Sequence, residues 1–292
     1  MRTLMNPFRF VVLTGLLLIG LFCAARPARA EEWTKTFGLT GRPTVRIATD
    51  DAAVQVVAGE AKQVVIRIEY QGYRLDRDLR VNALQNADRV ELDVRTSGHW
   101  CLFCSSEGRS RNVRIEVRMP RDADLNVEST DGSITIASID GNVDARTADG
   151  HIELKDSRGN LHLRTADGGI DASHLDGQLE ASSGDGRIRA EGRFDGLNLR
   201  TGDGSIEARA LPGSKMLSSW SLHTGDGSVD LSLPDGFQAN IDAHTNDGTI
   251  SLGLPLLMEG GLNRSNIHGK LNGGGQSLSI STGDGSIRIS RL

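Results

Sequence analysis

"TADGHIELKDSRGNLHLRTADGGI", residues 147–170, contains the same phrase twice. Thr147-Ala-Asp-Gly-His-Ile152 returns one repeat later as Thr165-Ala-Asp-Gly-Gly-Ile170. Self-similarity at a fixed interval is the sequence signature of repeat architectures. The full phrase has Ser or Thr two positions before Asp-Gly and Ile or Val three positions after the aspartate. It occurs eight times, with its aspartate at Asp131, Asp149, Asp167, Asp185, Asp203, Asp226, Asp247 and Asp284.

The spacing and the residues around each aspartate predict strands. The first four intervals between aspartates are all 18, and the next are 23, 21 and 37, which we interpret as one repeat plus five, one plus three, and two plus one. If the aspartate is position 0, apolar or alanine side chains stand at −6, −4, +3 and +5, with polar side chains between most of them. Alternation with a period of two predicts strands with one buried face and one solvated face.

Two kinds of turn separate the predicted strands. The Asp-Gly pair of the phrase is one, and a weaker turn falls halfway through each repeat, near Asp140-Gly141, Arg158-Gly159, Asp176-Gly177 and Asp195-Gly196. Glycine accepts a positive φ without steric cost, and aspartate can hydrogen-bond its own turn backbone. We therefore expect the eight repeat aspartates to form a structural turn ladder.

Two architectures fit this pattern. Asp-Gly is a strong hairpin signal, so one is a meander of antiparallel strands. A meander would place about 16 strands in one open sheet, whereas open sheets rarely exceed about ten strands without curling or splitting. In a β-solenoid, each repeat is one coil that closes its own core, and like residues stack on like residues. The sequence favours an all-β solenoid with about 18 residues per coil, as the 18-residue intervals indicate.

The segment 1–30 reads as an export signal. Arg2 and Arg9 precede an uncharged apolar run at 11–22, and Ala28-Arg29-Ala30 matches a cleavage site. The run is shorter than the roughly 20 residues that span a bilayer. We expect an exported chain in the periplasm or at the cell surface, with no membrane span after cleavage. Without the leader the chain has 29 basic and 38 acidic residues, a net charge of −9, which argues against nucleic acid as a partner.

A candidate disulfide joins Cys101 and Cys104 in "HWCLFCSS". A local disulfide suits an oxidising compartment, and two free thiols are the alternative. A zinc site would need further ligands at suitable spacing, and the sequence has none nearby.

Residues 31–120 lack the repeated phrase but contain four strand-like runs, at 44–47, 64–68, 90–94 and 113–117. Terminal units of a solenoid must differ from the rest, because a bare end exposes core and unpaired strand edges. We expect this part to form irregular strands and a cap, with a separate small β domain as the alternative. The repeats then occupy residues 121–292. A Gly- and Asn-rich loop at 256–277 precedes the final repeat, and such a loop is a place for a binding surface.

The chain resembles a bacterial family of "putative adhesins", exported β-strand-repeat proteins formally of unknown function. The resemblance covers about residues 40–292, and its motifs are specific only as an ensemble. It depends on the export signal, Arg114-Ile-Glu-Val-Arg-Met-Pro120, the ladder of phrases and the ending "HGKLNGGGQSLSISTGDGSIRIS" at 268–290. The resemblance implies a β-solenoid at the cell envelope and carries over no catalytic residue.

Three chemical alternatives exist for the polar columns. Calcium-binding solenoids use a nonapeptide in which an apolar residue follows the aspartate by two positions, not by three as here. A glycosidase needs two carboxylates about 5–10 Å apart, one with a raised pKa, and no repeat aspartate stands out.

His223 and His244 share position −3 and are expected on adjacent coils, where they could hold a metal weakly. Arg146, Arg164 and Arg200 share that column and are expected to pair with acids such as Glu153 or Asp171.

These observations predict a non-enzymatic cell-envelope β-solenoid without a cofactor or metal, acting as an adhesin or structural surface-binding module. Its expected partner is a surface glycan or an envelope protein. The alternatives are an envelope-stress or regulatory accessory protein that binds a protein partner, and a carbohydrate-active β-helix enzyme.

Overall fold

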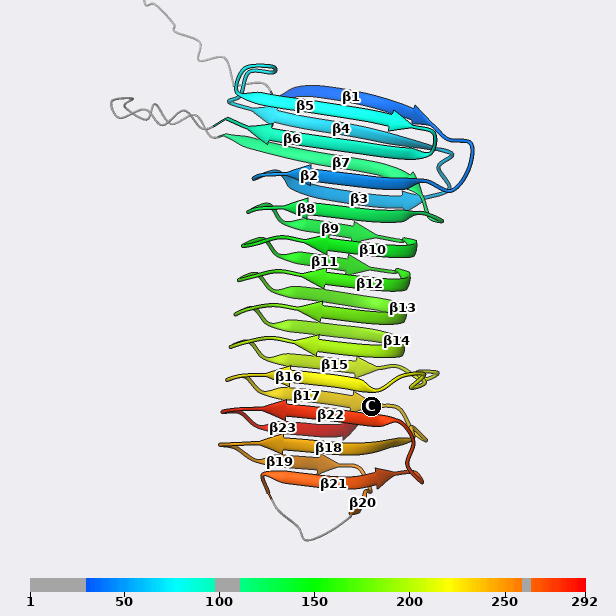
Figure 1. Ribbon diagram of the computed structural model, residues 1–292, viewed down its shortest axis with the longest axis vertical. Coiled ribbons are helices and arrows are strands. Elements are labelled where there is room, and N and C mark those ends of the chain that lie inside the picture. The colour runs from blue at the N-terminus through cyan, green and yellow to red at the C-terminus, as the bar shows by residue number, and fades with distance from the viewer. Residues whose placement is uncertain (1–29, 98–110, 259–263) are drawn as a thin grey trace, which may run out of the picture.

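The computed structural model describes residues 30–97, 111–258 and 264–292, and every regular element in these residues is a β-strand (Figure 1). The all-β prediction is therefore confirmed for this part of the chain. The expected leader (apart from Ala30) and the cysteine pair, Cys101 and Cys104, lie outside the described residues. The described residues contain no helix long and apolar enough to cross a bilayer.

The strands follow one another along the whole chain. Their bounds are β1 Glu31–Gly38, β2 Thr44–Thr49, β3 Ala53–Gly59, β4 Gln63–Gln71, β5 Leu79–Asn86, β6 Arg89–Thr96, β7 Asn112–Pro120, β8 Asp124–Ser129, β9 Ile134–Ala137, β10 Asp140–Arg146, β11 Ile152–Lys155, β12 Arg158–Arg164, β13 Ile170–Ser182, β14 Ile188–Arg200, β15 Ile206–Ala210, β16 Trp220–Thr224, β17 Val229–Leu233, β18 Ala239–Thr245, β19 Ile250–Gly253, β20 Leu257–Met258, β21 Asn266–Leu271, β22 Ser277–Thr282 and β23 Ile287–Arg291.

Backbone pairing arranges these strands in two stacks that run along the long axis of the molecule. We call them stack A and stack B. Stack A has the order β5-β6-β2-β8-β10-β12-β13-β14-β16-β22-β18-β21-β20. Stack B has the order β1-β4-β7-β3-β9-β11-β13-β14-β15-β17-β23-β19. The strands β13 and β14 run around a corner and belong to both stacks, so the molecule is β-solenoid-like.

The register explains why the apolar columns are so regular. In stack B, Ile134 pairs with Ile152, Ile152 with Ile170, Ile170 with Ile188, and Ile188 with Ile206. Each partner occupies the same position in the next repeat, and all five side chains are at most 1% exposed. Parallel pairing places like residues on like residues, so one apolar position per repeat generates a continuous buried row.

The last repeat does not stack at the end of the molecule. Strand β22 pairs with β16 on one side and β18 on the other, and β23 lies in the same way between β17 and β19. In Figure 1 the red terminal strands accordingly lie between yellow and orange ones. The interpretation of the 37-residue interval as two repeats plus one is therefore wrong, because an interval gives the length of a connection and not the place where it returns.

The segment 256–277, expected to be a loop, contains β20 and β21. Strand β21 pairs antiparallel with β18 and with β20. It therefore covers the edge of stack A beyond β18, and residues 272–276 then lead back to the inserted coil of β22 and β23.

The first coil is inserted in the same manner. Strand β2 lies between β6 and β8, and β3 lies between β7 and β9, all in parallel. Beyond them, β1, β4 and β5 pair antiparallel, β4 with both β1 and β7, and β5 with β6. Both ends of the solenoid thus carry antiparallel strands, while the coils between them are parallel.

The coil of β2 and β3 carries a degenerate copy of the repeated phrase that sequence analysis missed. Thr49, Asp51 and Val54 occupy positions −2, 0 and +3, and Ala52 stands where the other copies have glycine. The Cα register of β2 with β8 pairs Thr49 with Ser129, which is the same column. The apolar residues at −6, −4, +3 and +5 were the available signal, but the missing glycine concealed the match.

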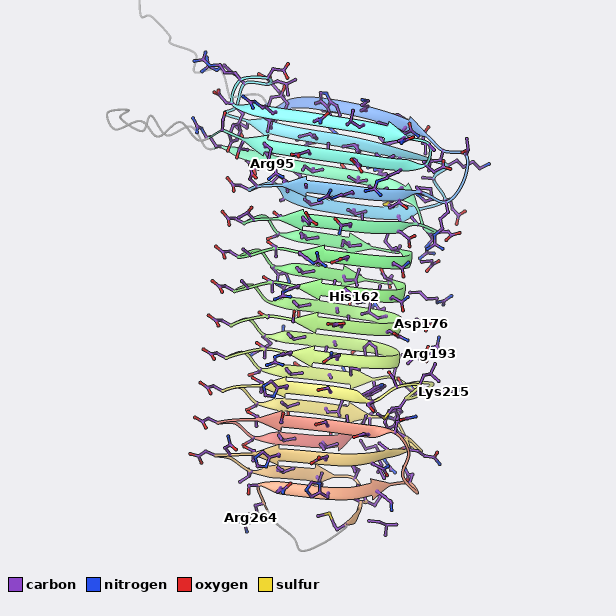
Figure 2. All side chains as sticks on the ribbon, viewed as in Figure 1. Arg95, His162, Asp176, Arg193, Lys215 and Arg264 are labelled. Atoms are coloured by element: carbon purple, nitrogen blue, oxygen red, sulfur yellow. The ribbon has the colours of Figure 1, made fainter. Side chains whose placement is uncertain are left out.

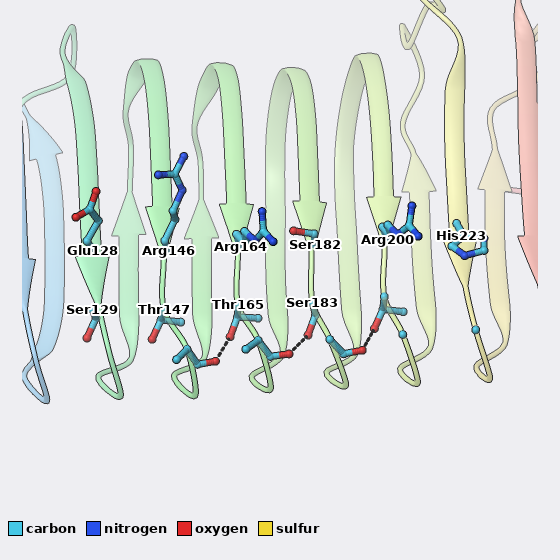
Figure 3. A pocket seen from close by; sticks show the side chains of 16 residues that line it. Glu128, Ser129, Arg146, Thr147, Arg164, Thr165, Ser182, Ser183, Arg200 and His223 are labelled. Atoms are coloured by element: carbon cyan, nitrogen blue, oxygen red, sulfur yellow. Dashed lines mark hydrogen bonds between the residues drawn. The ribbon is translucent and has the colours of Figure 1, made fainter.

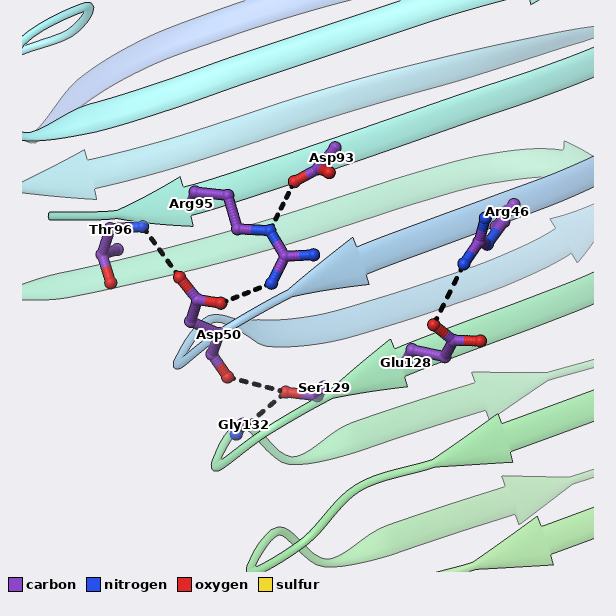
Figure 4. Close-up of polar contacts among 8 residues, drawn as sticks. All are labelled: Arg46, Asp50, Asp93, Arg95, Thr96, Glu128, Ser129 and Gly132. Carbon is purple, nitrogen blue, oxygen red and sulfur yellow. Dashed lines mark hydrogen bonds and ion pairs between the residues drawn. The ribbon is translucent and has the colours of Figure 1, made fainter.

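The turn of this first coil is tied to both of its neighbours (Figure 4). The Asp50 carboxylate accepts hydrogen bonds from Arg95 Nη1 at 2.6 Å and from the Thr96 N–H at 3.1 Å. The hydrogen bonds that Arg95 donates to the Asp50 and Asp93 carboxylates raise the pKa of Arg95. On the other side, Ser129 Oγ donates to the Asp50 carbonyl at 3.1 Å and accepts from the Gly132 N–H at 3.0 Å.

The halfway corner uses left-handed backbone at two positions. Ser138, Asp156 and His174 have φ between 50° and 67°, and Gly159 and Gly177 have φ of 122° and 125°. Only glycine adopts the second range without strain. The expectation that glycine supplies a positive φ therefore holds at Gly159 and Gly177.

Asp176 at this corner joins three consecutive coils. Its carboxylate accepts hydrogen bonds from Arg158 Nε at 3.2 Å and from Arg193 Nη2. Figure 2 shows Asp176 and Arg193 at the same edge of the solenoid. The Arg193 guanidinium, with a further contribution from Arg158, lowers the pKa of Asp176 from its ordinary value of 3.8.

The lowered pKa of Asp176 makes a pH prediction. A group with a depressed folded-state pKa contributes stability above its unfolded-state pKa, and this contribution disappears as the pH falls through the folded-state value. We expect Asp176→Asn to lower Tm by a constant amount from pH 7 down to about pH 4, and by progressively less below that. Thermal unfolding of both proteins across this range measures the difference. A difference that grows in acid would contradict the assigned direction.

Candidate functional site

The repeated turn is held by its hydroxyl side chain. Thr165 Oγ1 accepts a hydrogen bond from the Gly168 N–H at 3.1 Å, which closes the turn within one coil. The same hydroxyl group donates its proton to the preceding coil, where the Ala148 carbonyl lies at 2.9 Å and the Gly150 carbonyl at 3.1 Å. The same pattern recurs at five other hydroxyls of the column, which are Ser129, Thr147, Ser183, Thr201 and Thr224. Thr245 and Thr282 likewise donate to a carbonyl of the neighbouring coil. Position −2 is therefore the residue that links one turn to the next.

Removing this hydroxyl is expected to destabilise the chain measurably. The Thr165 side chain is 3% exposed, so Thr165→Val would leave the half-buried Gly168 N–H without its acceptor. We expect a loss of about 1–2 kcal/mol in the free energy of unfolding. Urea unfolding measures this loss. Thr130→Val, at an exposed turn position, is the control, and equal losses in both variants would contradict the role assigned to Thr165.

The glycine of the turn is required by stacking and not by its own φ. None of the glycines after the repeat aspartates has a positive φ. A Cβ at Gly150 would lie 2.2 Å from the Gly132 carbonyl oxygen, and one at Gly186 would lie 1.9 Å from that of Gly168. The expectation that a positive φ selects glycine here is therefore wrong. The backbone of the preceding coil occupies the space of the side chain.

The repeat aspartates all project to solvent. Each is exposed, and each backbone N–H donates to a carbonyl of the preceding coil in the stack, as Asp167 does to Ala148 at 3.0 Å. Within the described residues, seven of the eight side chains make no hydrogen bond or ion pair, and the exception, Asp131, contacts Asp51. Burial raises the pKa of Asp51, and the Asp131 and Asp50 carboxylates raise it further. The parts of the chain described here hold no cluster of three or more His, Cys, Asp or Glu side chains placed to bind a metal ion.

A groove of about 650 Å³ follows the turn side of stack A across six coils (Figure 3). Small residues at position −1 line it together with the hydroxyls at −2: Ala148, Ala166, Gly184, Gly202 and Gly225. Position −3 supplies the larger polar side chains, which are Glu128, Arg146, Arg164, Ser182, Arg200 and His223. Because neighbouring strands lie about 4.8 Å apart, the groove extends for roughly 24 Å along the axis.

The arginines of the groove differ in their partners. Arg146 pairs with Asp144 at 2.7 Å. No carboxylate of the described chain lies within ion-pair distance of Arg164 or Arg200, and both side chains are exposed. The expected pairing with Glu153 or Asp171 is wrong, because position −3 lies on stack A whereas those acids lie on the outer face of stack B.

The outer face of stack B is charge-paired throughout the same coils. Arg189 contacts Asp171 at 3.6 Å and Glu207 at 3.3 Å, and Arg209 contacts Glu191 at 3.2 Å. Exposed pairs of this kind contribute only about 0–1 kcal/mol each, yet they neutralise the charge of this face. The positive charge of the groove is therefore a property of stack A and not of the solenoid in general.

The two histidines at position −3 are not on adjacent coils. His223 Nδ1 lies 2.8 Å from Ser281 Oγ, and the register places Ser281 between His223 and His244. The prediction of adjacency is wrong because the last coil is inserted at this point. The two imidazoles are thus separated by a whole strand of the stack.

The fold and the groove define a class of protein, a β-solenoid-like fold of parallel coils that has antiparallel strands at both ends and an arginine-lined groove along one side. The chain belongs to the Toastrack DUF4097 family, whose model matches residues 44–290. The predicted resemblance is thereby confirmed. A search of curated proteins found no match.

Solved structures share the fold at low sequence identity. A crystal structure named "putative lipid binding protein" from Parabacteroides distasonis is 13% identical, with a TM-score of 0.52 over 88% of this chain and 96% of its own. A "putative adhesin" from Bacteroides fragilis is 9% identical, with a TM-score of 0.46 over 91% of this chain and 99% of its own. At such identities the first of these similarities supports the fold alone.

Proposed function

We propose that this protein is a non-enzymatic, exported β-solenoid of the cell envelope that acts as a surface-binding module, and that the groove of stack A is its binding surface. The observation that carries the proposal is the uncompensated charge of Arg164 and Arg200 beside a floor of small residues. Backbone hydrogen bonds between the strands fix the spacing of these two residues along the stack. Preorganisation of this kind lowers the entropy lost on binding.

The domain organisation belongs to the same proposal. Residues 1–30 act as the export signal, residues 31–120 form irregular N-terminal strands and a cap, and residues 121–292 form the repeat solenoid. The antiparallel pairing of β1, β4 and β5 supports the role of a cap, since a bare parallel edge would invite further strands. The exposed repeat aspartates act as turn residues and not as ligands.

The absence of catalysis is part of the proposal. Glycoside hydrolysis needs a carboxyl group with a raised pKa near a second carboxylate. Burial raises the pKa of the Asp51 carboxyl group, but neither Asp51 nor the adjacent Asp131 lines the groove.

Fractionation of native cells tests the localisation, and an envelope-binding assay tests the function. We expect the chain in the periplasmic or surface fraction, with surface shaving by protease deciding between these two. Purified protein should sediment with isolated envelopes and release no glycan fragments. Recovery in the cytoplasm, or cleavage of an envelope glycan, would contradict the proposal. Saturable binding to an envelope protein, without binding to any envelope glycan, would show that the partner is a protein.

A further inference from the structure

We infer that the groove of stack A recognises an extended anionic glycan whose acidic groups are spaced about 10 Å apart, with Arg164 and Arg200 as the two recognising residues. This inference depends on the proposed function and specifies the chemistry of its ligand. Arg164 and Arg200 share position −3 and are two coils apart, with the neutral Ser182 between them. The ligand would lie along the axis of the solenoid.

The charges around the groove select an anion of low charge density. At one end, Glu128 is paired with Arg46 at 3.2 Å, and Arg146 is paired with Asp144. The unpaired cations are therefore limited to the middle of the groove. The row of exposed repeat aspartates lies three positions further along each coil, in the turn, and would repel a densely charged chain such as a nucleic acid. Acidic groups about 10 Å apart would meet the two arginines without crowding that row.

The backbone of the floor favours a glycan over an extended peptide. An added peptide strand gains most of its affinity from main-chain hydrogen bonds to an open sheet edge. Here the N–H groups of Gly184 and Gly202 already donate to the carbonyls of Ala166 and Gly184, at 2.5 and 2.6 Å. The groove lies across strands that are paired on both sides, and so it offers side-chain donors and no free edge. Arginine forks bind carboxylates in two parallel hydrogen bonds, which suits the acid of a uronic sugar.

The test compares two doubly substituted variants of equal charge. Arg164→Gln/Arg200→Gln removes both groove cations, and Arg80→Gln/Arg187→Gln removes two exposed arginines that also have no ion pair in the described chain. The probe is a hyaluronan oligosaccharide, which has one carboxylate per disaccharide. We expect binding that salt weakens, a loss of at least about tenfold for the groove variant, and little change for the control variant. Circular dichroism and Tm confirm that both variants are folded.

Further probes decide what the groove recognises. The carboxyl-reduced oligosaccharide should not bind, because it lacks the anion that the arginines contact. An equal loss in the two variants, or equal binding of the reduced sugar, would overturn the inference. Tighter binding of a glutamate-rich peptide would also overturn it, in favour of a protein partner.

Envelope sedimentation separates this inference from the proposed function. We expect the groove variant to lose envelope binding. If wild-type protein binds envelopes but not the oligosaccharide, and the groove variant loses envelope binding, the inference fails while the proposed function stands. If the groove variant binds envelopes as well as the wild type does, the groove is not the binding surface and both fail. If the wild-type protein binds neither, both fail.

Discussion

Gly168→Ala is expected to destabilise the solenoid by about 3 kcal/mol or more, although it adds a single methyl group to a surface turn. A Cβ at Gly168 would lie 2.0 Å from the Gly150 carbonyl oxygen and 2.9 Å from Thr165 Oγ1. The obstruction is backbone, and so no side-chain rotation relieves it. Relief requires the two coils to separate, which would stretch the hydrogen bond from the Asp167 N–H to the Ala148 carbonyl.

Two matched controls isolate the steric cause in urea unfolding and in Tm. At Gly59 an added Cβ meets nothing within 4 Å, so Gly59→Ala should be neutral or slightly stabilising. Asp167→Asn should cost less than about 1 kcal/mol, because the carboxylate is exposed and has no partner. A large loss from Asp167→Asn together with a small one from Gly168→Ala would reverse the assignment and indicate an ion site at the aspartates.

Deletion of residues 277–292 is expected to unfold the coil that precedes them in sequence. Strands β18 and β19 stack on β22 and β23 and not on β16 and β17. Without the terminal coil, β19 would lose its strand partner in stack B and β18 would keep only the antiparallel β21. The edges of β16 and β17 would also be uncovered, because β22 and β23, with the buried side chains Ile280 and Ile287, now pair with them.

Hydrogen exchange followed by peptide mass spectrometry measures where protection is lost. We expect fast exchange in 239–258 and 264–271 and retained protection in 134–200, because nearest-neighbour contacts dominate in solenoids. A synthetic peptide of residues 277–292 added in trans should restore protection in 239–245. Full protection of β18 in the truncated chain would show that it restacks directly on β16 and would contradict the inserted arrangement.

Several features followed from the sequence because they depend only on local periodicity. The alternation around Ile152 and Ile170 predicted strands, and the recurrence at a fixed interval predicted parallel stacking. Each such residue has the same environment in every coil, so a column of the sequence is also a row of the structure. The family resemblance rested on the same columns.

Other features depended on what stacks against a residue. The glycine of the Asp-Gly turn could be interpreted from sequence as a positive-φ residue, but the approach of the next backbone decides its identity. The partners of Arg164 could not be predicted, because Glu153 is close in sequence yet on the other stack. The groove became visible only when positions −1 and −3 of six coils were aligned in space.

The sequence by itself determined the β-strands, the buried rows and the existence of a repeated turn, because these are set by side chains within one repeat. Only the tertiary structure decided the order of the coils, the unpaired charge of Arg164 and Arg200, and the inserted places of the first and last coils. A connecting segment has a length but no direction in the sequence. Where it returns is decided by which strand edge and which apolar row it can complete.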